Sequence, residues 1–314
     1  MGKIVRWAAP FAITLAALAW VFQRVDFRIV AEQITPGAFG ILVPTLLVFG
    51  IVALFLEAEC LSQLLPATRE ALDRGTAARI KAASYPLALV HYAIGAGTLA
   101  VLLSRRTGRS VADAAGIVGL ISLFDIGIQL MMLAIGVTAL GTSAPAMRGG
   151  VAIGLMAAIG LGFLALRTRT SLGPLDRIRE LSVFDAARTT PAAKLLLLGS
   201  LRLLFALVFV SLIGVCCSAF GIEVPWTFLL AAVPLLIVVA MIPSVAGLGT
   251  GQIAFVSIFG RYGNEETLLA CSLAFSAGLI ILRAGMGLLF AREFTREAFV
   301  AARERTDDAA GSTP

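Results

Sequence analysis

The sequence predicts an all-α, polytopic membrane protein, from its composition, the length of its apolar segments and two glycine breaks inside them. Of the 314 residues, 59% are hydrophobic and 14% are charged, and the mean hydropathy is +0.95. Soluble domains have about 45–50% apolar and about 25% charged residues. A helix needs about 20 apolar residues to cross the hydrocarbon core. Apolar segments of about this length or more cover residues 7–23, 39–62, 76–104, 114–140, 147–167, 195–219, 226–260 and 267–291.

Two of these segments are too long for one crossing, and both contain a Gly-x-Gly-Thr sequence. It starts at Gly95 in residues 76–104 and at Gly247 in residues 226–260. Glycine and proline cost about 1 and 3 kcal/mol in a helix interior, so each segment is expected to form two half-helices that meet at a bend. Unwound backbone is tolerated in a bilayer only where it is buried in protein or lines a wet cavity. The matched pair therefore predicts a site in an internally repeated, transporter-like fold.

The distribution of basic residues indicates how the two long segments lie. If the N-terminus is cytoplasmic and both segments return to the side they enter from, 19 of the 25 Lys and Arg residues are cytoplasmic and 4 are outside. If both segments crossed fully, the split would be 11 and 12. The positive-inside bias therefore favours six crossing helices and two re-entrant helical hairpins, related by an inverted repeat. Both termini are then expected to be cytoplasmic.

The polar and terminal segments carry three further expectations. Residues 7–23 follow two basic residues as a signal peptide would, but cleavage would leave a weak apolar core, which favours a retained first helix. The loop 167–194 suits a short amphipathic helix on the cytoplasmic face, and a solvated connector fits equally well. Residues 1–295 are thus expected to form one integral membrane domain, followed by a polar, disordered tail over residues 296–314.

Metal, nucleic-acid and catalytic functions find no support in the sequence. The net charge of +6 comes from basic residues mostly at the ends of apolar segments, where they set topology. With one histidine, His91, no nucleophile–base pairing is visible. The cysteines lack metal-ligand spacing, and they are expected to pack as small apolar side chains in membrane helices. They are Cys60, Cys216, Cys217 and Cys271.

Three ionisable residues deep in apolar segments are candidates for a functional site. Asp125 would cost roughly 2.5–3.5 kcal/mol at a helix centre, so it is expected to face the bundle interior with a partner. Arg202 and Arg283 are its candidate partners, or they could snorkel to the interface. All three are expected within about 10–15 Å of the cytoplasmic face, so Asp125 could pair with either arginine. Such a pair could handle a headgroup or a proton, or be purely structural. Glu57 and Glu59 lie about 160° apart on their helix, and snorkelling to the interface is expected for them.

The glycine bends themselves could hold an anion. Glycine permits positive φ and close backbone approach, and N–H groups at the start of the following half-helix could then face a cavity. A packing bend without a ligand is the alternative. His91 precedes the first bend and is expected to be a hydrogen-bonded structural residue or, less readily, a substrate contact.

Two sequence blocks resemble the flippase-like family, which comprises the transmembrane region of lysylphosphatidylglycerol synthases and stand-alone bacterial and archaeal relatives, including hopanoid-associated membrane proteins. One block runs from Gly95 to Asp125, and the other covers residues 242–249 and the helix that follows. The resemblance spans roughly residues 5–295. It implies transfer of lipid between leaflets. Synthesis is not implied, because the chain ends after its last helix without the soluble transferase domain.

The chain departs from the family pattern beside both bends. The resemblance implies a glutamate after each glycine turn, but Thr98 and Gln252 occupy those places. An arginine common after the first turn is replaced near Val101, and a glutamate expected before Asp125 falls near Ile121. The bends are thus retained while the charges around them differ.

We therefore expect an inner-membrane lipid flippase or transporter, in which the headgroup crosses through a groove where the two hairpin tips meet. Its expected partners are membrane lipids, anionic or of polyprenyl or hopanoid type, and no cofactor or enzyme activity is expected. The alternative is a non-transporting membrane partner that presents a lipid to a lipid- or glycan-modifying enzyme. The residues expected to line the groove or tune its charge are His91, Gly95, Gly97, Thr98, Asp125, Arg202, Pro243, Ser244, Gly247, Gly249, Thr250, Gln252 and Arg283.

Overall fold

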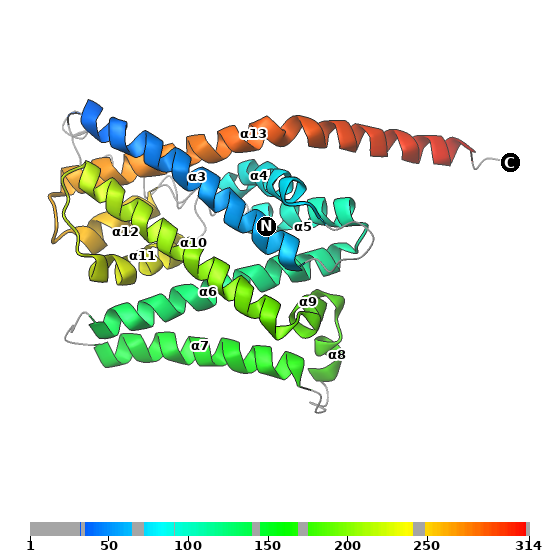
Figure 1. Cartoon of the computed structure of the whole chain (residues 1–314), viewed down its shortest axis with the longest axis horizontal. Coiled ribbons are helices and arrows are strands. Elements are labelled where there is room, and N and C mark those ends of the chain that lie inside the picture. The colour runs from blue at the N-terminus through cyan, green and yellow to red at the C-terminus, as the bar shows by residue number, and fades with distance from the viewer. Residues whose placement is uncertain are drawn as a thin grey trace, which may run out of the picture.

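The regular structure is entirely helical in the part of the chain that the computed structural model describes, as predicted (Figure 1). The described residues are 32, 35–64, 72–90, 92–139, 145–168, 175–240 and 249–311. Their helices are α3 (Pro36–Leu64), α4 (Arg74–Val90), α5 (Tyr92–Thr107), α6 (Val111–Ala139), α7 (Pro145–Arg167), α8 (Leu175–Arg179), η1 (Ser182–Phe184), α9 (Asp185–Thr189), α10 (Ala192–Ala219), α11 (Trp226–Ala240), α12 (Thr250–Phe259) and α13 (Glu265–Gly311).

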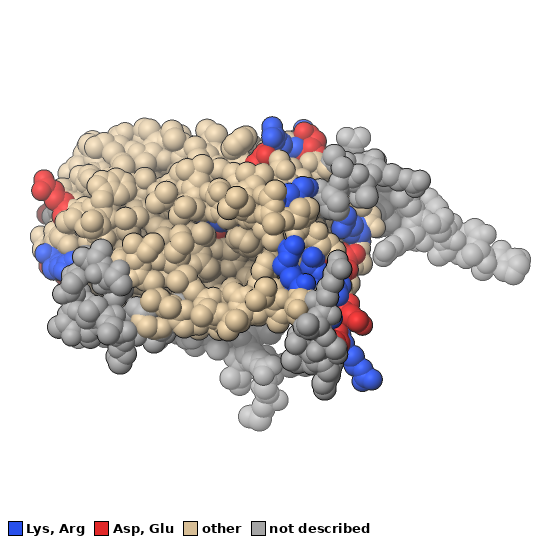
Figure 2. Space-filling view, turned by 60° about the horizontal axis from the view of Figure 1, so that its bottom comes forward, with Lys and Arg blue, Asp and Glu red and all other residues tan. Residues whose placement is uncertain are grey.

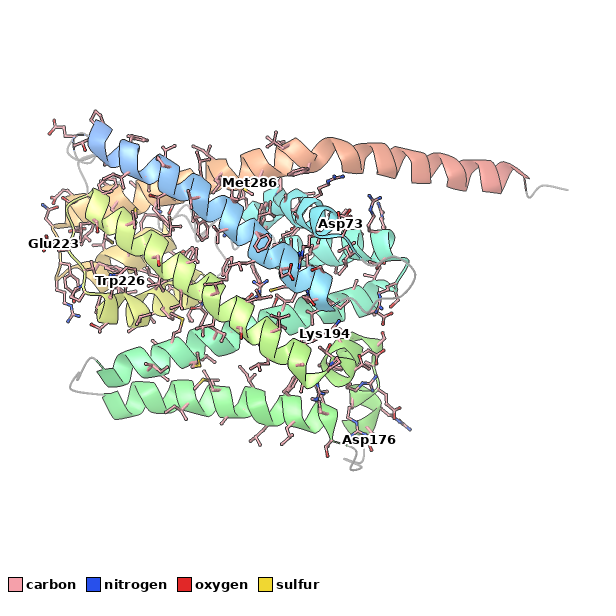
Figure 3. The ribbon with its side chains drawn as sticks, in the orientation of Figure 1. Asp73, Asp176, Lys194, Glu223, Trp226 and Met286 are labelled. Carbon is pink, nitrogen blue, oxygen red and sulfur yellow. The ribbon has the colours of Figure 1, made fainter. Side chains whose placement is uncertain are left out.

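Four described helices, α3, α6, α10 and α13, are long and apolar enough to cross a membrane. Of the other two predicted crossings, residues 7–23 lie outside the described residues and residues 147–167 fall within α7. Figure 2 shows a wide belt of uncharged residues over the bundle, with charged side chains gathered mostly at one end. Asp73, Asp176 and Lys194 lie at this end, and Glu223 and Trp226 lie at the other (Figure 3).

Each of the two overlong segments forms two helices that fold back on each other. One position, 91, separates α4 from α5, and Gly95 packs so closely on α4 that an added Cβ would lie 2.6 Å from the Cα atom of Ala88. In the second segment, Phe228 near the start of α11 packs on Phe259, the last residue of α12, with ring centroids 5.6 Å apart. The way in which these pairs enter the membrane, and the inverted repeat, stay predictions.

The first helix break does not lie at its Gly-x-Gly-Thr sequence, which corrects the sequence-based prediction. Gly95 and Gly97 lie inside α5, which begins at Tyr92. Gly95 is buried and permits the close approach to α4, whereas Gly97 is exposed and an added Cβ there would meet nothing within 4 Å. Gly249, by contrast, directly precedes α12 with φ 83°. The two similar sequences therefore occupy different positions relative to their bends.

The helices pack around two apolar cores, one toward each end of the bundle. The first core contains residues of α3, α6, α10, α11, α12 and α13, from Leu42 to Cys271. The second core, at the charged end, combines the C-terminal part of α3 with residues of α4, α5, α6, α9 and α10, including Leu61, Leu103 and Leu198. Because α3, α6 and α10 contribute to both cores, these three helices pass from one core to the other.

The loop 167–194 is divided into the short helical pieces α8, η1 and α9, which pack on the bundle end. The Arg167 guanidinium donates hydrogen bonds to the carbonyl oxygens of Ala187, at 3.2 Å, and Thr190, at 2.8 Å. Gly116 of α6 lies so close to η1 that an added Cβ would be 2.9 Å from the carbonyl carbon of Val183. These contacts pack the described part of the loop on α6 and α7. Its predicted place on the cytoplasmic face of the membrane stays a prediction.

The helix α13 continues to Gly311 and extends past the rest of the bundle (Figure 1). It therefore includes most of the 296–314 tail, for which the sequence predicts disorder. Ala, Glu and Arg are frequent in this stretch, and all three favour helix strongly. The high polarity that suggests a disordered tail is equally compatible with a solvated helix.

Candidate functional site

Charged side chains from four helices meet between the two apolar cores. A guanidinium nitrogen of Arg202 on α10, Nη1, lies 3.3 Å from Asp125 Oδ1 on α6 and 3.9 Å from Glu57 Oε1 on α3. The ammonium group of Lys81 on α4 forms an ion pair with Glu57. We call Glu57, Lys81, Asp125 and Arg202, together with Arg283, the charge cluster.

The position of the charge cluster follows from how the charges are placed along the helices. In each of α3, α6 and α10, a charged residue stands between the part of the helix in one core and the part in the other. These residues are Glu57, Asp125 and Arg202. Because the three helices cross between the cores, their charged residues reach the same depth and can pair there.

Arg202 and Asp125 differ sharply in exposure. The Arg202 side chain is 3% exposed, whereas that of Asp125 is 32% exposed. The Nε atom of Arg202 has no hydrogen-bond partner among the described residues. A buried guanidinium is costly unless its five N–H donors are satisfied, so this arrangement leaves a donor unused beside an accessible carboxylate. Ionisable side chains inside a membrane bundle are costly to bury, so these residues are candidates for a functional site.

Arg283 of α13 joins the cluster through an aromatic ring. Its guanidinium carbon lies 6.0 Å from the ring centroid of Tyr85 on α4, and Lys81 Nζ lies 5.9 Å from the same centroid. No carboxylate of the described residues forms an ion pair with Arg283. The cluster therefore holds three cations and two carboxylates.

The prediction that Asp125 forms an ion pair is confirmed. Of its two predicted partners, the structure selects Arg202. Glu57 was expected to snorkel to the interface, but it lies within the charge cluster. Glu59 pairs instead with Arg74 near the charged end, where Arg74 Nη2 donates to Glu59 Oε1 at 3.0 Å.

Sequence reasoning missed Glu57 and Lys81 as site residues. Both lie inside their apolar segments, 39–62 and 76–104, by at least five residues. That depth makes a position in the bundle interior possible, but a long side chain five residues from a segment end can also reach the interface, so depth alone does not identify them.

The polar groups predicted at the hairpin tips bond mainly within the protein where the structure describes them. The Thr98 hydroxyl donates to the carbonyl oxygen of Ile94 in its own helix, at 2.8 Å. Gln252 is 1% exposed, accepts from the Gly249 N–H at 2.6 Å and donates to Ser276 Oγ at 3.1 Å. Gln252 thus ties the start of α12 to α13.

The remaining tip residues are only partly covered by the structure. Thr250 is the first residue of α12. Four predicted groove residues lie outside the described residues, namely His91, Pro243, Ser244 and Gly247. The meeting of the two tips therefore stays a prediction, and the charge cluster is the site whose geometry is established.

In a comparison with protein families, the family described as the lysylphosphatidylglycerol synthase TM region matches residues 7–287. The chain belongs to this family. The match includes the whole charge cluster and both overlong segments. A search of the curated proteins finds no match. Family membership and the apolar helices together make this chain a multi-pass membrane protein.

Proposed function

We propose that this member of the family is a lipid transporter, which moves a polar-headed lipid between the leaflets of the inner membrane and has no enzymatic activity of its own. The observation that carries the proposal is the charge cluster, in which Asp125 is one-third exposed within an apolar bundle. A polar headgroup loses its bound water when it enters hydrocarbon, at a high cost in free energy. The charged side chains of the cluster can replace that water as hydrogen-bond and charge partners of the headgroup.

The depth of the cluster supports this role. Asp125 lies 14 residues beyond the start of α6, and Arg202 lies 10 residues beyond the start of α10. At about 1.5 Å per residue, both side chains lie roughly 15–21 Å along their helices. The hydrocarbon core is about 30 Å thick, so this is close to its middle. In Figure 2, a few charged atoms are visible within the uncharged belt, away from the charged end of the bundle, which supports access to buried charges from outside the bundle.

In this proposal, α4–α5 and α11–α12 are re-entrant hairpins that enter from opposite faces and are related by an inverted repeat. The base of α11–α12 lies beside Arg261, whose guanidinium carbon is 4.2 Å from the Phe228 ring centroid. Arg74 and Arg105, at the base of α4–α5, belong to the basic residues that the positive-inside rule places in the cytoplasm. Both termini are then cytoplasmic. Because α4 carries Lys81 and leads to a hairpin tip, the headgroup path runs from the cluster toward the tips.

The test is a reconstitution of the full chain in liposomes that contain a fluorescent lipid. The rate of transbilayer movement is measured by quenching the probe in the outer leaflet. We expect movement faster than in empty liposomes, and a decrease of about tenfold in Asp125→Asn, the change expected from a loss of ~1.4 kcal/mol of stabilisation. Asp113→Asn, in the first turn of the same helix, is the matched control and should leave the rate unchanged.

Unaccelerated movement across a panel of anionic, zwitterionic and polyprenyl lipids would overturn the proposal. If the purified chain then also retained an enzyme in stoichiometric amount, the alternative function as a lipid-presenting partner would be selected. Equal loss of transport in Asp113→Asn and Asp125→Asn would show that the charge cluster has no special part in movement.

A further inference from the structure

Among the described residues, the charge cluster has more cations than carboxylates, and one of its buried hydrogen-bond donors has no acceptor. Lys81, Arg202 and Arg283 oppose only Glu57 and Asp125 among the described residues. The Nε donor of Arg202 is unpaired there although the side chain is only 3% exposed. Both features, an excess cation and an unused buried donor, are what an absent anionic acceptor would complete.

The two carboxylates of the cluster are held differently. Glu57 is 12% exposed and pairs closely with Lys81. Asp125 is 32% exposed, and its oxygen atoms lie 3.3 and 3.5 Å from Arg202 Nη1. Charge-assisted hydrogen bonds are usually about 2.7–2.9 Å long, so the contact between Asp125 and Arg202 is loose. Asp125 is therefore the carboxylate that an incoming anion can displace.

The geometry points to an anion site in which a phosphate group takes the place of the Asp125 carboxylate on Arg202, with Lys81 and Arg283 contributing positive charge. This inference rests on the proposed function and specifies its substrate class as lipids with an anionic phosphate headgroup. A planar guanidinium binds phosphate through two parallel N–H···O bonds, and the free Nε of Arg202 completes such a pair with one of its Nη atoms. A cationic headgroup would meet the three cations of the cluster and be repelled.

The site exchanges one anion for another. With the site empty, Asp125 neutralises part of the Arg202 charge. With phosphate bound, Asp125 is released, and its like charge then favours departure of the phosphate. Removal of the Asp125 charge should therefore strengthen phosphate binding and slow release. A purely structural ion pair differs in that the wild-type protein would then bind no phosphate group.

The experiment measures binding separately from transport. The full chain is placed in phosphatidylcholine nanodiscs that contain equal small amounts of phosphatidylglycerol and a trimethylammonium lipid, and the lipids retained after mild extraction are quantified by mass spectrometry. We expect enrichment of phosphatidylglycerol over the cationic lipid by about tenfold, which corresponds to ~1.4 kcal/mol. Asp125→Asn should raise the enrichment, and Arg202→Lys, which lacks the forked guanidinium, should abolish it.

A second arm tests whether free phosphate is the ligand instead. Equilibrium dialysis with radiolabelled inorganic phosphate is carried out on the protein in a neutral detergent. Retention of phosphatidylglycerol without phosphate binding assigns the site to a lipid headgroup, and phosphate binding alone assigns it to the free anion. Absence of both, or weaker binding in Asp125→Asn, overturns the inference. Anion-selective binding without transport would refute the proposed function but support the anion site. Transport without a preference for anionic lipids would support the proposed function but refute the anion site.

Discussion

Replacement of Gly95 by alanine is expected to destabilise the protein, whereas the same replacement at Gly97 is not. A Cβ atom at Gly95 would lie 2.6 Å from the Cα atom of Ala88, within the backbone of α4. Carbon atoms pack best at about 3.5–4.0 Å, so α4 and α5 would have to separate by roughly 1 Å. The Cβ atom at Gly97 would meet nothing within 4 Å.

The two substitutions are expected to change the stability of the protein in opposite directions. Overpacking of a fitted interface costs about 1–3 kcal/mol, so Gly95→Ala should be destabilised by that amount less the gain in helix propensity. Alanine is about 0.8–1 kcal/mol more favourable than glycine in a helix interior, so Gly97→Ala should be neutral or stabilised. Both glycines lie inside α5, so the gain in helix propensity applies to both variants and cancels in their difference. The expected difference is therefore the overpacking cost of about 1–3 kcal/mol, a factor of roughly 5–150 in the ratio of folded to unfolded protein.

The assay compares the temperature at which half of the monodisperse protein is lost, by size-exclusion chromatography in one detergent, for the wild type and both variants. The same variants are then tested for lipid movement at a temperature where all are folded. If the two variants were equally stable and both stopped lipid movement, the packing argument would be refuted. Gly95 would then belong, with Gly97, to a ligand-lining bend.

Two further predictions concern other contacts of the bundle. Gln252→Ala removes the hydrogen bond from the Gln252 amide to Ser276 of α13 and the one that its carbonyl oxygen accepts from the Gly249 N–H, so it should lower stability by about 1–3 kcal/mol in the same thermal assay. Gln252→Glu keeps the acceptor for Gly249, so its stability should lie between those of the wild type and Gln252→Ala. The Sγ atoms of Cys216 and Cys271 lie 3.4 Å apart, so treatment with diamide should give a disulfide that links α10 to α13 in peptide mapping. Linkage through Cys60 instead would contradict the packing of these helices.

The charge cluster was partly foreseeable from the sequence. Asp125 lies so deep in its apolar segment that it was expected in the bundle interior, with Arg202 or Arg283 as its partner. The structure selects Arg202. Glu57 and Lys81 lie nearer the ends of their segments, where a long side chain can reach the interface as easily as the interior. Only the packing of α3 against α4 and α10 decides between these positions, and packing partners are not encoded in the depth of a single helix.

The helix breaks show a different limit. The length of residues 76–104 correctly indicated two helices, but α4 ends at Val90 and α5 begins at Tyr92, so Gly95 lies inside a helix and not at the break. A glycine that permits a bend and one that permits close packing look alike in a sequence. The cost of about 1 kcal/mol for glycine within a helix is small enough for packing to outweigh it. Gly249 directly precedes α12 with φ 83°, a backbone conformation that favours glycine, as expected for a glycine at a bend.

The spacing of the charge cluster along the chain has a consequence for biosynthesis. Arg202 follows Asp125 by 77 residues. At roughly 5–20 residues per second, a ribosome needs about 4–15 s to add them. During this interval α6 must enter the membrane with a carboxylate whose final partner does not yet exist, at a cost of roughly 2.5–3.5 kcal/mol. Lys81 has already been synthesised, so α4 can supply a provisional counter-ion and hold α6 in place until α10 arrives.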